Sequence, residues 1–493
     1  MKIRLFIKNT VILVATSLIL RTVGVLFKVW LADHIGQEGV GLYQLIFSVY
    51  ILAATFASSG VSTAVTRLVA ENEDKGKQAV KKIMKTAVTI TLTAAAVSTA
   101  AVYFGSDVIA KHLLKDIRAV PSLKILSFSL PFMGLSSCMR GYFIARRKTL
   151  QPSLVQLLEQ TVRIVTVVAL ITVTANKGLT QAAAAVLLGD TVAETVSFLV
   201  NFALYKLDVK RLEAGQTVDN VTRKILHVAL PISGSGYLSS ALHTAENLLI
   251  PRRLSLFYGN RTRGLELFGA VRGMALPILF FPASFLTSLA TMLIPEVSSA
   301  AGQGNNLRIR LTVERAVAIT LTLSTLVATV FMFNAQSLGD VIYGDRDTGN
   351  IILILSPIVP FMYLESVTVG LLKGLDCQHS ILKYNTADSI LRIISVYITL
   401  PLFGIKAYLL TMIISNCFTS SMGLCCLKNR SGIRLDLKLW VLLPFLFGTV
   451  GGLIGYCLSF GLHNSFAKLL VSGSIQCAFC LVAMFFLKRK IVR

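Results

Sequence analysis

The chain has 493 residues, of which 54% are hydrophobic and 15% charged, and its mean hydropathy is +0.71. The apolar residues fall in long blocks, which excludes a protein built around one soluble core and favours one whose solvent is the lipid bilayer. A net charge of +24 would suggest nucleic acid in a soluble protein, but here the cations gather in alternate loops, so we expect no nucleic-acid partner.

The first apolar block follows Lys2, Arg4 and Lys8 and superficially resembles a secretory signal. No small-residue cleavage site follows, and Arg21 and Lys28 interrupt the block, so we predict a retained first helix. A membrane-spanning helix needs roughly 20 mostly apolar residues, and such blocks recur along the chain. The predicted spans, about fourteen, are residues 9–33, 40–70, 83–104, 119–139, 152–175, 181–205, 225–250, 265–295, 311–335, 349–372, 381–402, 405–427, 439–460 and 466–487.

The loops between these spans differ in charge. If both termini are cytoplasmic, the inside loops collect most of the cations, whereas the outside loops are poor in them. An excess of lysine and arginine marks the cytoplasmic side, so we predict an even number of spans in a bacterial cell membrane with both termini inside. One loop disagrees, because it places four arginines outside: Arg252, Arg253, Arg261 and Arg263.

An internal repeat is visible in the chain. Residues 125–137 recur 229 residues later as residues 354–366, with eight of thirteen positions identical. The repeating unit has an even number of helices, so both copies cross the membrane in the same sense, related by a pseudo-twofold axis along the membrane normal. We therefore predict an all-α polytopic membrane protein with two six-helix lobes and two extra helices, divided as 1–210, 211–430 and 431–493.

Two pairs of opposite charges occupy matching places in the repeat. Glu159 and Arg163 stand at i and i+4, and at the same offset of 229 residues Asp388 and Arg392 do likewise. This spacing lets each acid meet its base on one helix face. A pair that neutralises itself and holds each lobe together is one interpretation, and direct contact with a substrate or an ion is the other.

Cations inside the membrane are costly and should face protein or a wet cavity. Arg21 corresponds at an offset of 225 residues to Glu246, and Lys28 to Arg253. Arg21 and Lys28 are candidates to bind a diphosphate in a central cavity, which the geometry of arginine suits. Alternatively, Arg21 and Glu246 form a salt bridge between lobes, and Lys28 reaches the outer membrane surface.

Other membrane-embedded charges are candidates for the same cavity. Arg272 falls inside the eighth span, where we favour a cavity role. Asp190 and Glu194 lie one turn apart and could share a proton or bind a cation, which makes them candidates for ion coupling. Glu365 lies in the repeated segment, near one of two prolines, Pro131 and Pro360, that should break the fourth and tenth helices and free backbone carbonyls.

No cofactor or metal site is predicted. Cys477 and Cys480 form a C-x-x-C pair, but the pair lies in the last apolar block without histidine or carboxylate, so we interpret it as structural. No loop is long enough to carry the acid, base or histidine groups of a membrane glycosyltransferase or ligase, so we do not expect an enzyme.

Several segments resemble the stage V sporulation protein B family. They are spread over the first eight predicted spans in the family's order and cover about half of the chain. These segments are Ile35–Gln44 with Arg21 before it, Leu68–Glu71, Arg140–Phe143, Leu158–Ile164, Pro251–Leu254 and Gly273–Ile278.

The resemblance implies membership of the superfamily of lipid II flippases, polysaccharide-repeat exporters and multidrug and toxin extruders. It implies transport of undecaprenyl-diphosphate-linked peptidoglycan precursors, in this branch for the spore cortex. By similarity to lipid II flippases, Arg21, Lys28 and Arg272 would bind the diphosphate. Residues 40–70 lack the mid-span arginine of those flippases, so lipid II itself is not specified.

We therefore expect a monomeric transporter that flips lipid-linked glycans, with the glycan carrier and membrane lipids as its partners. The alternative is an ion-coupled multidrug exporter, which carboxylates such as Asp190, Glu194, Glu246 and Glu365 favour and the two extra helices disfavour. A scaffold protein would gain nothing from a duplicated bundle with charges inside the membrane.

Overall fold

The computed structural model describes residues 2–58, 60–174, 178–462 and 464–491, and throughout these residues the chain forms helices joined by short connections, without a β-strand. Ten of the described helices are long and apolar enough to cross a membrane. One bent pair, Ile117–Ser127 and Ser129–Ala145, would add an eleventh span if it crosses as a unit. The protein is therefore an all-α, multi-pass membrane protein, as the sequence predicts.

Two of the ten helices are far longer than one membrane crossing. Helix α1 (Lys2–Ser58) has 57 residues and α15 (Gln378–Ser431) has 54, so each measures roughly 80 Å at about 1.5 Å per residue. Each contains a glycine with non-helical dihedral angles, Gly36 and Gly404, at the place where the sequence predicts a boundary between spans. Each of these helices thus has the length of two spans, and the total of fourteen stays a prediction.

The chain forms two compact units. Unit 1 comprises Met1–Phe27 and His34–Leu248, and unit 2 comprises Lys28–Asp33 and Leu249–Arg493. The predicted lobes end instead at residues 210 and 430, and that division, which follows the repeat, stays a prediction. Besides most of α1, unit 1 contains α2 (Val61–Glu71), α3 (Gly76–Val108), α4 (Val120–Ser127), α5 (Ser129–Ala145), α6 (Leu150–Thr174), α7 (Leu179–Lys210) and most of α8 (Val221–Tyr258).

The second predicted span, 40–70, is wrong as one continuous helix. Helix α1 ends at Ser58 and α2 begins at Val61, with Gly60 between them at φ +75°. Helix α8 approaches this break so closely that a Cβ on Gly60 would lie 2.4 Å from the carbonyl oxygen of Ala229. Buried side chains of α2, α3, α5 and α8 form an apolar core on this side of unit 1.

The predicted breaks in the fourth and tenth helices are confirmed. Helix α4 ends at Ser127, and a short turn at Ser356–Ile358 separates α13 (Arg346–Leu355) from α14 (Val359–Gly374) at the matching place in the repeat. The carbonyls near both breaks are satisfied locally, because Ser129 donates to the Leu126 oxygen at 2.7 Å and Ser356 to the Ile352 oxygen at 2.6 Å. At the first break, Ile117–Ser127 and Ser129–Ala145 are bent by 42° relative to one another, and at both breaks at least one nearby carbonyl is occupied.

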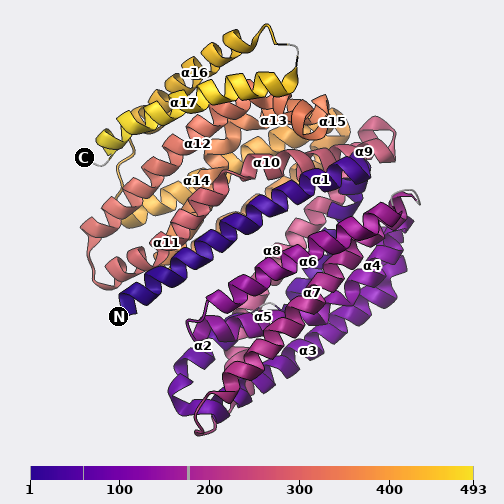
Figure 1. Cartoon of the computed structure of the whole chain (residues 1–493), viewed down its shortest axis with the longest axis vertical. Helices are drawn as coiled ribbons and strands as arrows, with labels where there is room; N and C mark the ends of the chain where they lie inside the picture. Colours follow the sequence, from indigo (N-terminus) through magenta and orange to yellow (C-terminus); the bar gives the residue numbers. More distant parts are fainter. Residues whose placement is uncertain (1, 59, 175–177, 463, 492–493) are drawn as a thin grey trace. The chain divides into compact units, whose positions relative to one another are not determined.

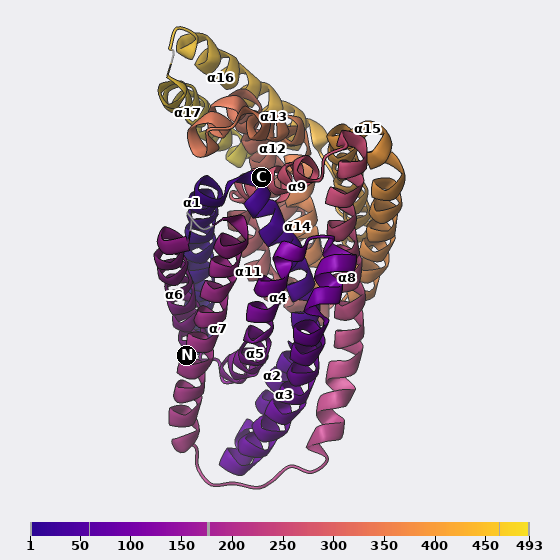
Figure 2. The same cartoon turned by 90° about the vertical axis from the view of Figure 1, so that its right-hand side faces the viewer.

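The connection between α7 and α8, at the bottom of Figure 2, is tied to the start of α3. The backbone N–H of Gln216 donates to the Lys75 oxygen at 2.9 Å, and that of Lys77 donates to the Glu213 oxygen at 2.8 Å. Gly215 fits here because a Cβ on it would lie 2.0 Å from the same Lys75 oxygen. Two predicted cytoplasmic loops of unit 1 are thus joined by backbone hydrogen bonds.

Unit 2 is arranged around α12 (Asn306–Tyr343), which packs against α11, α13, α14, α16 and α17. The last two helices lie side by side next to α12 (Figure 1). Glycines of α16 allow this close packing, since a Cβ on Gly448 would lie 2.2 Å from Thr329 and one on Gly455 would lie 2.9 Å from Ser472. The bounds of the remaining helices are α9 (Arg261–Gly269), α10 (Leu276–Phe280), α11 (Ala283–Gly302), α16 (Leu443–Ser459) and α17 (Ser465–Ile491).

The eighth predicted span, 265–295, is also interrupted. A π-helical turn, η5 (Ala270–Ala275), separates α9 from α10, and a further break at Phe281 and Pro282 separates α10 from α11. Neither interruption is predicted from the sequence.

Candidate functional site

Arg163 of α6 lies among three carboxylates from two helices of unit 1. Its guanidinium is 2.9 Å from Glu159 one turn earlier, 2.6 Å from Asp190 of α7 and 3.9 Å from Glu194, one turn further along α7. We call these four residues the Arg163 cluster. The predicted contact between Glu159 and Arg163 is confirmed, and the structure adds the two predicted ion-coupling residues to it.

Further polar groups complete the surroundings of Glu159. Ser197 of α7 donates a hydrogen bond to it at 2.8 Å, and Arg140 of α5 lies 4.0 Å away. Glu159 is 9% exposed and Asp190 6%, so the cluster is shielded from solvent. A buried ion pair survives only when its remaining lone pairs and protons are satisfied, and the serine and the second arginine supply part of that.

Two carboxylate oxygens of the Arg163 cluster have no hydrogen-bond donor in the described part of the chain. The Oδ2 atom of Asp190 and the Oε2 atom of Glu194 are buried and have no hydrogen-bond partner among the described residues. Buried carboxylate oxygens without a partner are where a proton or a cation would be held. Arg163 already occupies the space between the two acids, so any ion bound there competes with its guanidinium.

Unit 2 repeats this arrangement in a looser form. Arg392 lies 4.0 Å from Asp388, which confirms the second predicted contact, and Ser415 donates to both oxygens of Asp388, at 2.7 and 2.9 Å. Glu365 of α14 lies within electrostatic reach of Asp388 and Arg392. An acid, an arginine four residues later and a serine from the next helical segment therefore recur in both units.

Arg272 lies within the π-helical turn η5 of unit 2. The residues on either side of it, Val271 and Gly273, are buried, while Arg272 itself is partly buried. The turn is stabilised from α12, where the Tyr343 hydroxyl donates to the Met274 oxygen at 3.2 Å. Single π-helical turns inside α-helices occur often at functional sites, and this one is a feature that the sequence analysis missed.

The remaining predicted substrate-binding residues are divided between the units. Arg21 and Glu246 belong to unit 1, whereas Lys28 belongs to the short segment of α1 assigned to unit 2. Arg21 is exposed, Lys28 is partly buried and Glu246 is 1% exposed, with His243 of the preceding turn 4.0 Å from it. A common role for these residues in substrate binding stays a prediction.

The four arginines that disagree with the predicted orientation lie in helices, two in α8 and two in α9, and at least two of the four have partners within the protein. The guanidinium of Arg253 lies 3.5 Å above the ring centre of Tyr397, and Arg263 contacts Asp347 at 2.8 Å and Glu266 at 3.1 Å. Hydrogen bonds to Asp347 and Glu266 raise the pKa of Arg263 above its ordinary value. At least two of the four cations are thus tied to the protein's own side chains.

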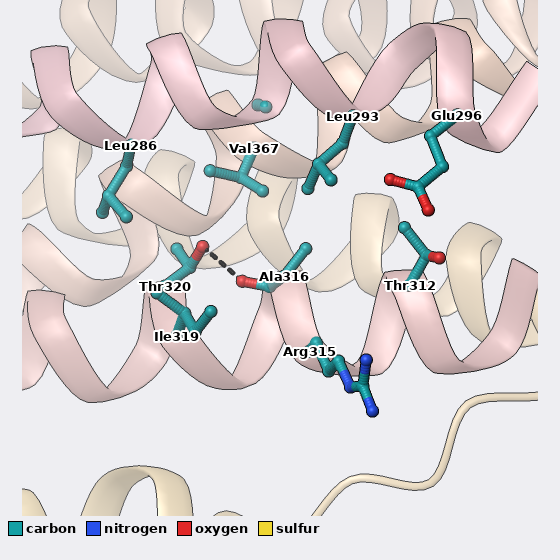
Figure 3. Close-up of a pocket in the computed structure, with 10 residues that line it drawn as sticks. Leu286, Leu293, Glu296, Thr312, Arg315, Ala316, Ile319, Thr320 and Val367 are labelled. Atoms are coloured by element: carbon teal, nitrogen blue, oxygen red, sulfur yellow. Dashed lines mark hydrogen bonds between the residues drawn. The ribbon is translucent and has the colours of Figure 1, made fainter. Parts of the chain in front are cut away.

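A small pocket of about 210 Å³ lies between α11 and α12 (Figure 3). Leu286, Leu293 and Ile319 give it apolar walls, and Glu296 and Thr312 point toward one another at its polar end. Glu296 also lies 3.6 Å from Arg308, next to the connection between the two helices. That contact links the last turns of α11 to the first turn of α12.

Comparison with known families identifies the group to which this architecture belongs. The sequence profile described as "Polysaccharide biosynthesis protein" matches residues 6–300, and the profile named MatE matches residues 269–398. The chain belongs to the polysaccharide biosynthesis protein family. The range matched by this family's profile, residues 6–300, contains the Arg163 cluster and Arg272.

Among curated relatives, "Stage V sporulation protein B" of Bacillus subtilis is 26% identical over 92% of this chain and 90% of its own length. "Lipid II flippase MurJ" of the same organism is 23% identical over 32% of this chain and 31% of its own. The predicted resemblance to the stage V sporulation protein B family is confirmed.

Solved structures confirm the fold. A structure of "Lipid II flippase MurJ, inward closed conformation" matches with a TM-score of 0.75 and 15% identity, covering 97% of this chain and 99% of that one. An inward-facing multidrug resistance MATE family transporter matches with a TM-score of 0.64 and 15% identity, covering 84% and 94%. The flippase structure therefore accounts for more of the chain than the extruder structure does.

Proposed function

We propose that the chain flips polyprenyl-diphosphate-linked sugars or peptidoglycan precursors across the bacterial cell membrane. The relative that matches over nearly the whole chain is named for sporulation, and the solved structure that covers most of it is a lipid II flippase. These names support a role in cell-wall or spore-cortex synthesis. The proposed orientation has both termini in the cytoplasm, and the chain acts as a monomer.

The observation that carries the proposal is the position of Arg272. It places a guanidinium in a π-helical turn between buried residues, inside a run of helix that is otherwise apolar. A guanidinium suits a diphosphate, because its planar array of N–H donors can contact phosphate oxygens in a bidentate way. Arg21 and Lys28 would contribute further positive charge to the same head group.

Transport of this kind requires no covalent chemistry from the protein. The diphosphate and sugar would pass through the protein while the polyprenyl chain stays in lipid. The two like-oriented halves would alternate between an inward and an outward opening, as inverted or parallel repeats do in other transporters.

The test is transport of fluorescent lipid II in proteoliposomes containing the purified protein. We expect Arg272→Ala and Arg21→Ala to slow flipping at least tenfold, because each removes a charge-assisted contact with the diphosphate. Arg346→Ala is the matched control, since the side chain of Arg346 is 88% exposed, and its flipping rate should equal that of the unaltered protein.

The same vesicles separate the proposal from its alternative, an ion-coupled multidrug exporter. The partnerless oxygens of Asp190 and Glu194 favour the exporter, because such a protein needs carboxylates that bind and release an ion. If lipid II and simpler polyprenyl-diphosphate sugars stay in the inner leaflet while a cationic drug is transported, the flippase proposal is wrong.

A further inference from the structure

A cavity of about 540 Å³ lies in unit 2 where the ends of α12 and α16 meet the beginning of α17. We call it the α17 cavity. Lys468 and Ser472 of α17, Tyr456 of α16, and Gln336 and Ser337 of α12 line it, together with apolar side chains. The three helices lie side by side in Figure 1, so the cavity is held by neighbouring elements of one unit.

A polar stripe runs from this cavity into the protein along one face of α17. Lys468, Ser472 and Gln476 are spaced four residues apart, which puts them one above another on the helix. Gln476 is fully buried, where it accepts a hydrogen bond from Asn334 at 2.9 Å and donates one to the Gly448 oxygen at 3.1 Å. The inner end of the stripe is therefore satisfied by the protein itself.

The polar groups at the outer end of the stripe, those of Ser472 and Lys468, lack such partners within the described ranges of the chain. Ser472 is only 4% exposed, and its hydroxyl has no hydrogen-bond partner among the described residues. Lys468 is partly buried, and its ammonium forms no ion pair or hydrogen bond with any described residue. Buried polar groups are as a rule hydrogen-bonded, so a hydroxyl and a cation that face one cavity indicate a ligand with an acceptor.

The α17 cavity has a lysine in its lining, which favours an anionic ligand. None of its described lining residues is an aspartate or glutamate. The nearby Asp340 accepts a hydrogen bond from Ser465 at 3.3 Å and lies 4.0 Å from Arg346, and it is not among the described residues that line the cavity. An ammonium group would find no carboxylate here, whereas a phosphate would find Lys468 and Ser472.

The rest of the cavity suits an amphiphile. Met332, Phe333, Leu353 and Leu453 give it an apolar wall, and Tyr456, 52% exposed, stands at its edge. Tyrosine is enriched where a membrane protein meets the lipid head groups. A phosphate joined to hydrocarbon chains satisfies both halves of such a cavity.

We propose that the α17 cavity binds an anionic phospholipid of the phosphatidylglycerol type. Its phosphate contacts the Lys468 ammonium and the Ser472 hydroxyl, its glycerol head group bonds to Gln336 and Ser337, and its acyl chains cover the apolar wall. In the orientation proposed above, this end of α17 lies at the outer leaflet. The bound molecule is a membrane lipid, and the inference does not depend on what the chain transports.

Native mass spectrometry of the full-length protein in detergent, titrated with dioleoylphosphatidylglycerol, tests this site. We expect Lys468→Gln to weaken binding about tenfold and Ser472→Ala to weaken it a few-fold, because a charge-assisted contact exceeds a neutral one. Lys468→Arg should retain binding. Lys406→Gln, which removes an exposed lysine of α15, is the matched control and should bind as the unaltered protein does.

Three results would each overturn the proposal. One is equal binding of phosphatidylglycerol by the Lys468→Gln and Lys406→Gln proteins, and another is equal binding of phosphatidylethanolamine by the unaltered protein. The third is displacement of the lipid by inorganic phosphate, which would show a site for the free anion. Because Lys468→Arg keeps the charge, loss of binding in that variant together with an unchanged melting temperature would also contradict the assigned contact.

Discussion

At the scale of single residues, Arg163 connects two helices through three acids. Helix α6 supplies Glu159 and α7 supplies Asp190 and Glu194, so the guanidinium is the group that lets these carboxylates lie together away from water. Removing one partner of a buried ion pair is far more destabilising than the pair is stabilising, since it leaves an uncompensated buried charge.

We therefore expect Arg163→Gln to destabilise the protein by about 3 kcal/mol. The measurement is the melting temperature in detergent, with glutamine chosen because it keeps much of the side-chain volume. The loss should shrink when Glu159→Gln is added, because one of the buried acids left without its counter-charge is then neutral.

Arg392→Gln in unit 2 is the matched control. Its contact with Asp388 is longer, 4.0 Å, and Asp388 keeps the bifurcated hydrogen bond that the Ser415 hydroxyl donates to its two oxygens. The control should therefore lower the melting temperature less than Arg163→Gln does. An equal effect of both substitutions would show that the three acids of unit 1 depend on Arg163 no more than Asp388 depends on Arg392.

At the scale of helices, hydropathy and turn residues predict most of the elements. The boundaries at Gly36 and Gly404 follow from glycines between two apolar blocks, and the breaks before Pro131 and Pro360 follow from proline's effect on a helix. The π-helical turn at Arg272 has no such signal, because it adds a residue to a helix without changing composition.

The contacts between helices are the part that the sequence leaves open. The spacing of Glu159 and Arg163 predicts their contact, because both lie on one helix. That Asp190 and Glu194 join the same guanidinium depends on how α6 packs against α7, which helical periodicity does not specify. That Lys468 and Ser472 face one cavity is likewise a matter of packing between α12, α16 and α17.

The break in α15 depends on the conformation of Gly404, so we predict that a substitution there destabilises the protein. Gly404 has φ +59° and ψ −139°, a conformation that is strained for any other residue, and a Cβ would lie 2.6 Å from the ring of Phe257. Gly404→Ala should destabilise the protein by about 2 kcal/mol, measured as a lower melting temperature.

Gly432, at the end of the same helix, is the control for Gly404. It has φ +64° and ψ +27°, in the left-handed region that other residues tolerate at modest expense, and nothing lies within 4 Å of a Cβ built on it. Gly432→Ala should therefore cost only about 1 kcal/mol. If the two alanines are equally tolerated, the bend at Gly404 does not require glycine.

At the scale of the whole molecule, the repeat and the extra helices support different functional proposals. Both units carry an acid and arginine pair in the fifth helix of the repeat and a break in the fourth, which favours a shared task in each half. Helices α16 and α17 have no counterpart in the repeat, and they line the α17 cavity together with α12. The duplicated part thus carries the proposed transport, and the proposed lipid site lies where the added helices meet α12.

The orientation of the chain decides which leaflet each of these sites faces. A fluorescent protein that matures only in the cytoplasm, fused after Arg493, should be bright, and alkaline phosphatase, active only outside, should be active when inserted after Leu462, between α16 and α17. A phosphatase inserted after Arg434, in a predicted inside loop, is the control and should be inactive. A dark terminal fusion together with active phosphatase at Arg434 would reverse the topology, and the α17 cavity would then face inner-leaflet lipid.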